Sequence, residues 1–133
     1  MALPIFTTRV YFDDTDAAGV VYHANYLKIF ERARNDQFLA LGFDHLSNYK
    51  ETGDCFVVKS LEIDYLSPAR LGDEIAVKSE VLDLTKIRII IGQTMVLSDK
   101  LLAKQKVTLI WINNTGKPTR MTQTMINLIS STR

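Results

Sequence analysis

The amino-acid sequence predicts an α+β fold in which one long helix packs against an antiparallel sheet. Three observations lead to this prediction: a short strand-like run comes first, one uninterrupted helical pattern follows, and four strand-like runs joined by short turns come after it. Short, hairpin-like connections indicate antiparallel neighbours. An amphipathic helix buries its apolar face against such a sheet, which gives two packed layers.

The first strand is expected at residues 6–12, where β-branched and aromatic side chains are frequent. The helix is expected at residues 25–41, a stretch without Pro or Gly, and Gly42 follows it where a left-handed residue commonly ends a helix. Apolar side chains share one face of this helix: Tyr26, Ile29, Phe30, Ala33, Ala40 and Leu41. The opposite face carries Lys28, Arg32, Asn35 and Asp36. Gln37 falls within the apolar face, so it has either a polar partner there or wetter surroundings.

A loop around Asn48 and Gly53 is expected after the helix, and the chain then turns to strands. Four strands with alternating apolar side chains are expected at residues 56–65, 74–84, 86–97 and 101–112. A short closing helix is expected at residues 122–129. One long helix covers only one face of a sheet, so an open edge or face is expected to meet a second copy of the chain.

The composition limits the class of protein. The 133 residues, 47% hydrophobic and 23% charged, are typical of one soluble globular domain, expected over residues 1–133. The net charge of +1 gives no electrostatic reason for nucleic acid or an acidic membrane as the main partner. The single cysteine, Cys55, forms no internal disulfide, which suits a cytoplasmic location. Neither a signal-peptide pattern nor an apolar run of the roughly 20 residues that span a bilayer is present.

The candidate site lies between the first strand and the helix, where three acids, Asp13, Asp14 and Asp16, precede the small residues 17–19. A helix start carries unpaired N–H groups and a partial positive charge. A carboxylate beside such groups can attack a carbonyl, or activate water against it, while the N–H groups stabilise the oxyanion. Asp16 is the first candidate, because the small residues after it let a ligand approach the backbone. Helix capping, or a solvated loop, is the alternative role for these acids.

His23 is the second candidate, as a general base or as a group that orients a carbonyl. Its alternative role is to fix the loop by a hydrogen bond. Tyr22 and Tyr26 flank the same region, and rings of this kind more often belong to a core. Asn25 is expected to cap the helix, with a substrate contact as the alternative. The histidines and acids lack the spacing of a metal site, so no metal is expected.

Charged side chains elsewhere have ordinary explanations. Glu31 and Arg34 are expected to form an ion pair on the flank of the helix. His45 is expected to be structural or exposed. Basic residues of the strands and turns offer weak candidates for a phosphorylated ligand, since most such side chains are simply solvated: Lys59, Arg70, Lys86, Arg88 and Lys104.

A long motif resembles the hotdog-fold acyl-CoA thioesterases of the 4-hydroxybenzoyl-CoA thioesterase family. It reads DTDAAGVVYHANY over residues 14–26 and FERAR over residues 30–34, and a later segment matches at Tyr65, Pro68, Ala69, Gly72 and Asp73. The resemblance covers nearly the whole chain and looks closest to the bacterial branch associated with the Tol-Pal envelope system. It implies a long helix wrapped by a five-stranded antiparallel sheet, assembled as dimers or tetramers. One departure is Ala18, where many members have Gly.

The resemblance implies hydrolysis of the thioester of acyl-CoA, or of acyl-carrier protein, to a free acid without a cofactor. It assigns Asp16 as nucleophile or general base, His23 as a supporting catalytic residue, and a backbone N–H near His23 as donor to the thioester carbonyl. It also places the site at a subunit interface, with residues 56–65 contributed by the partner chain. Substrate-binding candidates are Gly19, Val21, Tyr22, Asn25 and Lys59.

Other functions of the same fold stay open from the sequence. One is a non-catalytic hotdog module that binds acyl-thioesters or scaffolds an envelope or lipid-synthesis complex. A hotdog dehydratase is a further alternative, although its His and Asp pair is arranged differently from Asp16 and His23. Retention of Asp16 in its motif favours the hydrolase.

Overall fold

The computed structural model describes residues 3–133. Its elements follow in chain order: β1 (Phe6–Arg9), the 3-10 helix η1 (Phe12–Asp14), α1 (His23–Ala40), α2 (His45–Thr52), β2 (Cys55–Tyr65), β3 (Glu74–Leu84), β4 (Arg88–Leu97), β5 (Lys100–Ile112) and α3 (Gln123–Ser130).

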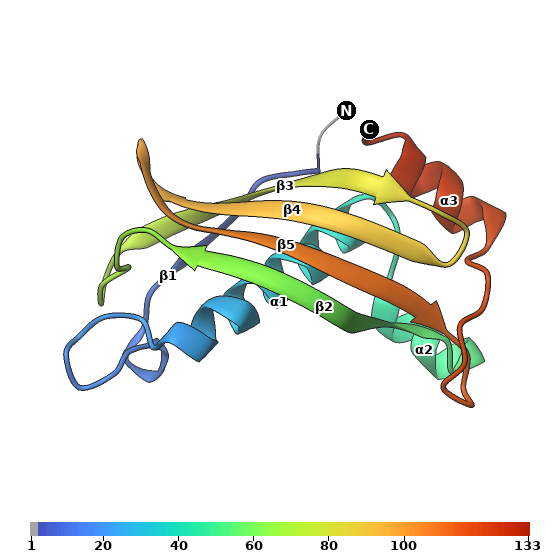
Figure 1. Cartoon of the computed structure of the whole chain (residues 1–133), viewed down its shortest axis with the longest axis horizontal. Helices are drawn as coiled ribbons and strands as arrows, with labels where there is room; N and C mark the ends of the chain where they lie inside the picture. The colour runs from blue at the N-terminus through green and yellow to red at the C-terminus, as the bar shows by residue number, and fades with distance from the viewer. Residues whose placement is uncertain (1–2) are drawn as a thin grey trace.

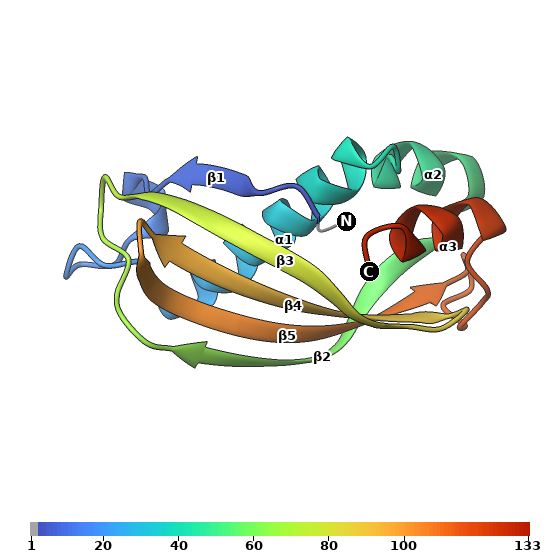
Figure 2. The same cartoon turned by 90° about the horizontal axis from the view of Figure 1, so that it is seen from above.

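The five strands form one antiparallel sheet in the order β1-β3-β4-β5-β2. Figure 1 looks onto the sheet, with α1 crossing behind it. Figure 2 shows α1, α2 and α3 on one side of the sheet and the other side uncovered. The expected α+β fold, with one long helix on a five-stranded antiparallel sheet, is therefore confirmed.

The connection from β2 to β3 is not the hairpin that the sequence suggests. β2 pairs with β5, whereas β3 lies between β1 and β4, so residues 66–73 cross the end of the sheet. The N–H groups of Leu66 and Ser67 fasten this crossover segment by donating to the Leu102 carbonyl at 2.9 and 3.1 Å. The prediction was wrong because Pro and Gly mark a turn without specifying which strands it joins.

α1 begins at His23, two residues before the expected start, and ends at Ala40. Its end is a Schellman motif: Gly42 has a φ of 101°, and the Phe43 N–H donates to the Phe38 carbonyl at 2.9 Å. Ala40 is exposed and Phe38 buried, so the expected apolar face is wrong in its last turn. Phe38 is buried because its ring packs against the rings of Phe43 and Phe56, with centroids 6.4 and 6.1 Å away.

α2 occupies the stretch that was expected to be a loop. Its N-cap is Asp44, whose carboxylate accepts hydrogen bonds from the Ser47 N–H at 3.1 Å and the Ser47 hydroxyl at 3.0 Å. Gly53, with a φ of 76°, follows its last residue. The Asp-x-x-Ser spacing and the terminal Gly were readable signals, but the segment has few apolar residues to suggest a helix.

Other boundaries shift by a few residues. β1 stops at Arg9 because the chain then turns into η1. β4 starts at Arg88 because Thr85 forms a turn before it, with the Thr85 hydroxyl accepting from the Arg88 N–H at 3.0 Å. The closing helix is confirmed as α3, capped by Thr122, whose hydroxyl accepts from the Met125 N–H at 3.2 Å.

Two hydrophobic clusters fill the space between helices and sheet. The cluster beneath the first half of α1 includes Val10, Val21, Tyr26, Phe30, Ala69 and Ile75. The cluster at the other end includes Phe38, Phe43, Ile89, Trp111, Met125 and Ile129. Within residues 3–133, no helix has the length and apolar character needed to cross a membrane.

Candidate active site

The acid loop, residues 13–21, folds back on itself just before α1. The Asp16 N–H donates to the Val20 carbonyl at 2.9 Å, and the Gly19 N–H donates to the Asp16 carbonyl at 3.1 Å. Gly19 has a φ of 77°, a left-handed conformation that glycine adopts without strain. Asp16 therefore stands at the base of a tight turn whose tip carries only small side chains.

The Asp16 side chain is exposed. Its Oδ1 accepts a hydrogen bond from the Ala18 N–H at 2.9 Å, which fixes the carboxylate relative to the loop. In the part of the chain that the structure describes, Oδ2 meets no hydrogen-bond donor. One carboxylate oxygen is thus positioned by the backbone, while the other has its lone pairs open to water or to a carbonyl carbon.

The other two acids are structural or exposed, as expected. Asp14 is buried, and its Oδ2 accepts a hydrogen bond from the Tyr11 N–H at 2.9 Å. Asp13 is exposed, and its carbonyl accepts from Asn25 Nδ2 at 3.2 Å. The prediction that Asn25 caps α1 is wrong, because Asn25 is the third helical residue and ties the helix to the acid loop instead.

The first turn of α1 presents backbone donors next to the acid loop. Tyr22 is its N-cap residue, with extended backbone angles and no side-chain capping bond. Among residues 3–133, no acceptor pairs with the N–H of His23 or of Ala24, whereas the Asn25 N–H donates to the Tyr22 carbonyl at 2.8 Å. Two free donors at a helix start, beside a carboxylate, are the components of a site that stabilises an oxyanion.

Tyr65, the last residue of β2, contacts the same turn. Its hydroxyl donates to the His23 carbonyl at 2.8 Å, and its ring packs edge-to-face on Tyr26, with centroids 5.1 Å apart. Burial, and then the neighbouring Tyr26, raise the pKa of the Tyr65 hydroxyl, which keeps it protonated as a donor. Tyr65 entered the sequence motif without a role because it lies far from His23 along the chain.

The crossover segment fastens the acid loop from the opposite side. The Val21 N–H donates to the Ala69 carbonyl at 2.8 Å, and the Leu71 N–H donates to the Gly19 carbonyl at 3.1 Å. The buried Ala69 N–H in turn donates to the Tyr26 hydroxyl at 3.0 Å. The conformation of the loop is therefore set by residues about 50 positions later in the sequence, and Tyr26 serves as the anchor between them.

Apart from Asn25, the candidate substrate-binding residues separate into three groups. Gly19 and Tyr22 lie with His23 at the acid loop, where Tyr22 is 47% exposed and its ring centroid is 4.5 Å from that of His23. Val21 is buried and its N–H is already paired, so the structure supports a packing role for it. Lys59 stands at a bulge in β2, and six strand residues place it about 20 Å from Tyr65, too far to serve Asp16 of its own chain.

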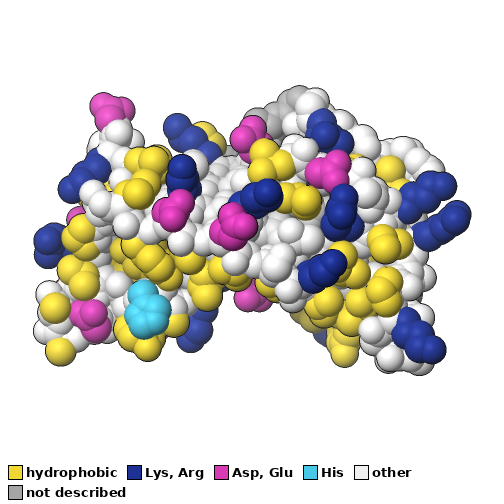
Figure 3. Space-filling view, in the orientation of Figure 1, with side chains coloured by type: hydrophobic (Ala, Val, Ile, Leu, Met, Phe, Trp, Pro, Cys, Tyr) yellow, Lys and Arg dark blue, Asp and Glu magenta, His cyan; other side chains and the backbone are white. Residues whose placement is uncertain are grey.

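β2 is a long edge strand that pairs only with β5 within the described chain. Hydrophobic residues of β2, and Leu66 just after it, are at least one-third exposed: Val57, Val58, Leu61, Tyr65 and Leu66. Figure 3 shows hydrophobic side chains gathered around the loop end of the molecule, at the left of the view. An edge of this length and character is a surface suited to pairing with another strand.

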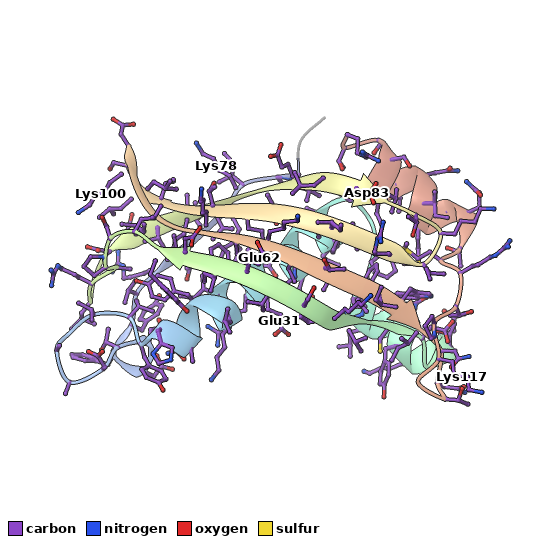
Figure 4. All side chains as sticks on the ribbon, viewed as in Figure 1. Glu31, Glu62, Lys78, Asp83, Lys100 and Lys117 are labelled. Carbon is purple, nitrogen blue, oxygen red and sulfur yellow. The ribbon has the colours of Figure 1, made fainter. Side chains whose placement is uncertain are left out.

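A buried polar network joins the middle of α1 to the sheet. Arg34 is only 7% exposed and donates to Gln93 Oε1 at 3.0 Å, and Gln93 Nε2 donates to the Phe30 carbonyl at 3.1 Å. The expected pairing of Arg34 with Glu31 is not formed: Glu31 points outward beside β2 in Figure 4, and burial lowers the pKa of the Arg34 guanidinium. Gln37 does have the polar partner it needed, since its Nε2 donates to the Val77 carbonyl at 3.3 Å.

The uncovered face of the sheet holds a groove of about 600 Å³. Charged side chains line it, including Glu62 of β2 and Lys78 of β3, which Figure 4 labels. Asp16 and His23 do not line this groove, whereas Lys104, one of the weak candidates for a phosphorylated ligand, does. Among residues 3–133, no group of three or more His, Cys, Asp or Glu side chains lies close enough to hold a metal ion.

Known proteins resemble this chain in sequence and in structure. The Acyl-CoA thioesterase YbgC of Haemophilus influenzae is 42% identical over 102 residues, which cover 77% of this chain and 75% of that protein. The 1,4-dihydroxy-2-naphthoyl-CoA hydrolase of Rippkaea orientalis is 30% identical over 131 residues, covering 96% and 95%. The crystal structure of a probable thioesterase from Bartonella henselae matches with a TM-score of 0.84 at 35% identity, covering 91% of this chain and 100% of that one.

The fold and these relatives define the class as the hotdog-fold thioesterases. Within that class, the model of the Thioesterase-like superfamily matches residues 10–127. The chain therefore belongs to the Thioesterase-like superfamily, and the resemblance found in the sequence is confirmed at the level of this superfamily.

Proposed function

We propose that this protein hydrolyses the thioester of an acyl-CoA to a free carboxylic acid and coenzyme A, with Asp16 as the key catalytic residue. The observation that carries the proposal is the exposed Asp16 carboxylate, fixed by one backbone hydrogen bond, beside the unpaired N–H groups of His23 and Ala24. The names of the related proteins support the thioester substrate class.

In this mechanism the thioester carbonyl accepts a hydrogen bond from the His23 N–H, which stabilises the negative charge that develops on its oxygen. Asp16 then acts by one of two routes. As general base it takes a proton from water, the water oxygen attacks the carbonyl carbon, and the thiolate leaves and is protonated. As nucleophile it forms a mixed anhydride with loss of the thiolate, and water then hydrolyses the anhydride. The exposed His23 side chain supports the site in either case.

The proposed enzyme is a homo-oligomer, dimer or tetramer, with its site completed by a second copy. The free edge of β2 supports this assembly, because antiparallel pairing about a two-fold axis sets the Tyr65 end of one β2 beside the Phe56 end of the other. Lys59 of the partner subunit would then lie near the acid loop, whereas Lys59 of the same chain is too far away to reach it. Lys59 and Tyr22 are the proposed contacts to the substrate at this interface.

The same proposal includes the branch of the family, the domain organisation, the location and the carrier of the acyl group. The long motif supports membership of the branch associated with the Tol-Pal envelope system. The length and composition support a single domain over residues 1–133, and the single cysteine, Cys55, supports a cytoplasmic location. Acyl-carrier protein is proposed as an alternative carrier of the acyl group, with no cofactor required.

The test is thiol release from short, long and aromatic acyl-CoAs, with the wild type beside Asp16→Asn. The asparagine retains an acceptor for the Ala18 N–H, so the loop should keep its shape while the base or nucleophile is lost. We expect turnover to fall by about 10²–10⁴-fold, with melting behaviour and oligomeric state unchanged. Asp13→Asn, at an exposed acid of the same loop, is the matched control.

Each outcome discriminates between functions. Turnover in the wild type that disappears only in Asp16→Asn supports the hydrolase. If the folded wild type binds acyl-thioesters without releasing thiol, the proposal is wrong and the non-catalytic module becomes the better description.

A further inference from the structure

The contact between Tyr65 and His23 joins two elements at the proposed site, and it has chemical consequences for the backbone there. The Tyr65 hydroxyl donates to the His23 carbonyl at 2.8 Å. That carbonyl and the N–H of Ala24 belong to one peptide group. A hydrogen bond accepted by the oxygen of a peptide group polarises the whole group, so its N–H becomes a better donor.

The polarised Ala24 N–H is available to donate a hydrogen bond to a ligand. Within residues 3–133 it has no acceptor, and it lies in the first turn of α1, where N–H groups point out of the helix beside the acid loop. The neighbouring His23 N–H is polarised in a parallel way, because its own peptide carbonyl, that of Tyr22, accepts from the Asn25 N–H at 2.8 Å. Both free donors thus belong to peptide groups whose oxygens are already engaged.

We propose that Tyr65 is a positioning residue of the thioesterase site: its hydroxyl fixes the first turn of α1 and polarises the Ala24 amide, which serves as a second donor to the oxygen of the reacting carbonyl. The proposal rests on the thioesterase function proposed above. It gives a function to the side chain of Tyr65, the last residue of β2, and to the backbone N–H of Ala24, which no side-chain motif in the sequence marks.

The packing of Tyr65 supports this role. Its ring is held edge-to-face by Tyr26, at 5.1 Å and 79°, and the Tyr26 hydroxyl is itself anchored by the Ala69 N–H at 3.0 Å. The Tyr65 ring also stands edge-on to the His23 ring at 6.5 Å. The hydroxyl therefore reaches the His23 carbonyl from a ring whose position is set by neighbours rather than by the contact itself.

The expected size follows from two magnitudes. Loss of one oxyanion donor lowers kcat by about 10²–10³-fold, and polarisation through one hydrogen bond changes the strength of the next by about 10–30%. Removing the Tyr65 hydroxyl should therefore lower kcat by about two- to eightfold. KM should stay within about twofold, because the oxyanion forms in the transition state and not in the bound substrate.

The experiment compares Tyr65→Phe with the wild type, and with Tyr49→Phe as a matched control. Phenylalanine keeps the packing on Tyr26 and removes only the hydroxyl. Tyr49 lies in α2, away from the acid loop, and is 53% exposed. Steady-state kinetics give kcat and KM, and the backbone amide proton and nitrogen resonances of Ala24 report its polarisation independently of turnover. In Tyr65→Phe the Ala24 proton resonance should move upfield, and in Tyr49→Phe it should not move.

The outcomes separate this proposal from the proposed function. A lower kcat together with a shifted Ala24 resonance supports the role of Tyr65. If the wild type turns over thioesters and Tyr65→Phe has an unchanged kcat or an unshifted Ala24 resonance, the role of Tyr65 is refuted and the thioesterase function stands. If the wild type hydrolyses no thioester, both proposals fail, whatever the resonance does.

Discussion

Tyr26 links α1 to the crossover segment, and replacing it with phenylalanine tests how the acid loop is held. The Tyr26 hydroxyl accepts the hydrogen bond of the Ala69 N–H at 3.0 Å, and both residues are buried, with exposures of 4% and 0%. Phenylalanine preserves the ring but leaves that amide without an acceptor. An unsatisfied buried donor costs about 1–3 kcal/mol of the free energy of unfolding, which lowers Tm by about 3 to 12 °C for a chain of this size.

The substitution should also lower turnover. The Ala69 carbonyl accepts the Val21 N–H at 2.8 Å, so a loosened Ala69 loosens the residue that leads into α1. Urea unfolding followed by circular dichroism measures the loss of stability as a lower midpoint with an unchanged slope. Tyr49→Phe, at an exposed tyrosine, should stay within about 0.5 kcal/mol of the wild type.

A change in Tyr26→Phe no larger than that in Tyr49→Phe would refute the reasoning. It would mean that the Ala69 amide finds another acceptor, and that the crossover segment is fastened to the acid loop by the remaining backbone bonds. A lower stability with unchanged turnover would refute only the link between this anchor and the geometry of the site.

Three further predictions concern positions away from the site. Gly53→Ala should lower the free energy of unfolding by more than about 1 kcal/mol, because Gly53 has a φ of 76° and an added Cβ would lie 2.8 Å from the Cβ of Asn114. The midpoint of denaturant unfolding measures this loss, and an unchanged midpoint would contradict the prediction. Thr122→Ala should cost about 1 kcal/mol by removing the α3 cap, whereas Thr122→Ser should retain most of the stability. Burial lowers the pKa of His45, whose Nε2 accepts a hydrogen bond from the Phe56 N–H at 3.3 Å. Because the unfolded chain binds more protons than the folded one, the free energy of unfolding should fall as the pH drops below about 6.5. Melting curves recorded across this pH range should show a weaker fall for His45→Gln than for the wild type.

Much of the fold was predictable because its signals are local. The alternating apolar residues of β3 and β5 placed those strands to within a residue, and Gly42 marked the end of α1. The strand order was not predictable in the same way. Pairing of β2 with β5 depends on contacts between distant residues, and a segment marked by Pro68 and Gly72 looks the same in the sequence whether it closes a hairpin or crosses a sheet.

Site residues could be predicted where a chemically active side chain also lies next to a recognisable element in the sequence. Asp16 and His23 stand out because one is a carboxylate before a helix and the other begins that helix. Tyr65 and Ala24 do not stand out, since a tyrosine in a strand usually packs in a core and an alanine has no functional side chain. The buried Arg34 shows a further limit, because the helical pattern offers Glu31 as its partner while the sheet supplies Gln93 from 59 positions away.

The pairing of β2 with β5 also has a consequence for the order in which the protein is made. β2 leaves the ribosome before β5, its one strand partner among residues 3–133, and the end of β5 follows about 50 residues later, or about 2 to 10 s at usual rates of synthesis. During that interval β2 has both edges bare and its apolar side chains unburied. The nascent chain is then at its most prone to misassociation, and the acid loop remains unordered until the crossover segment is drawn into place.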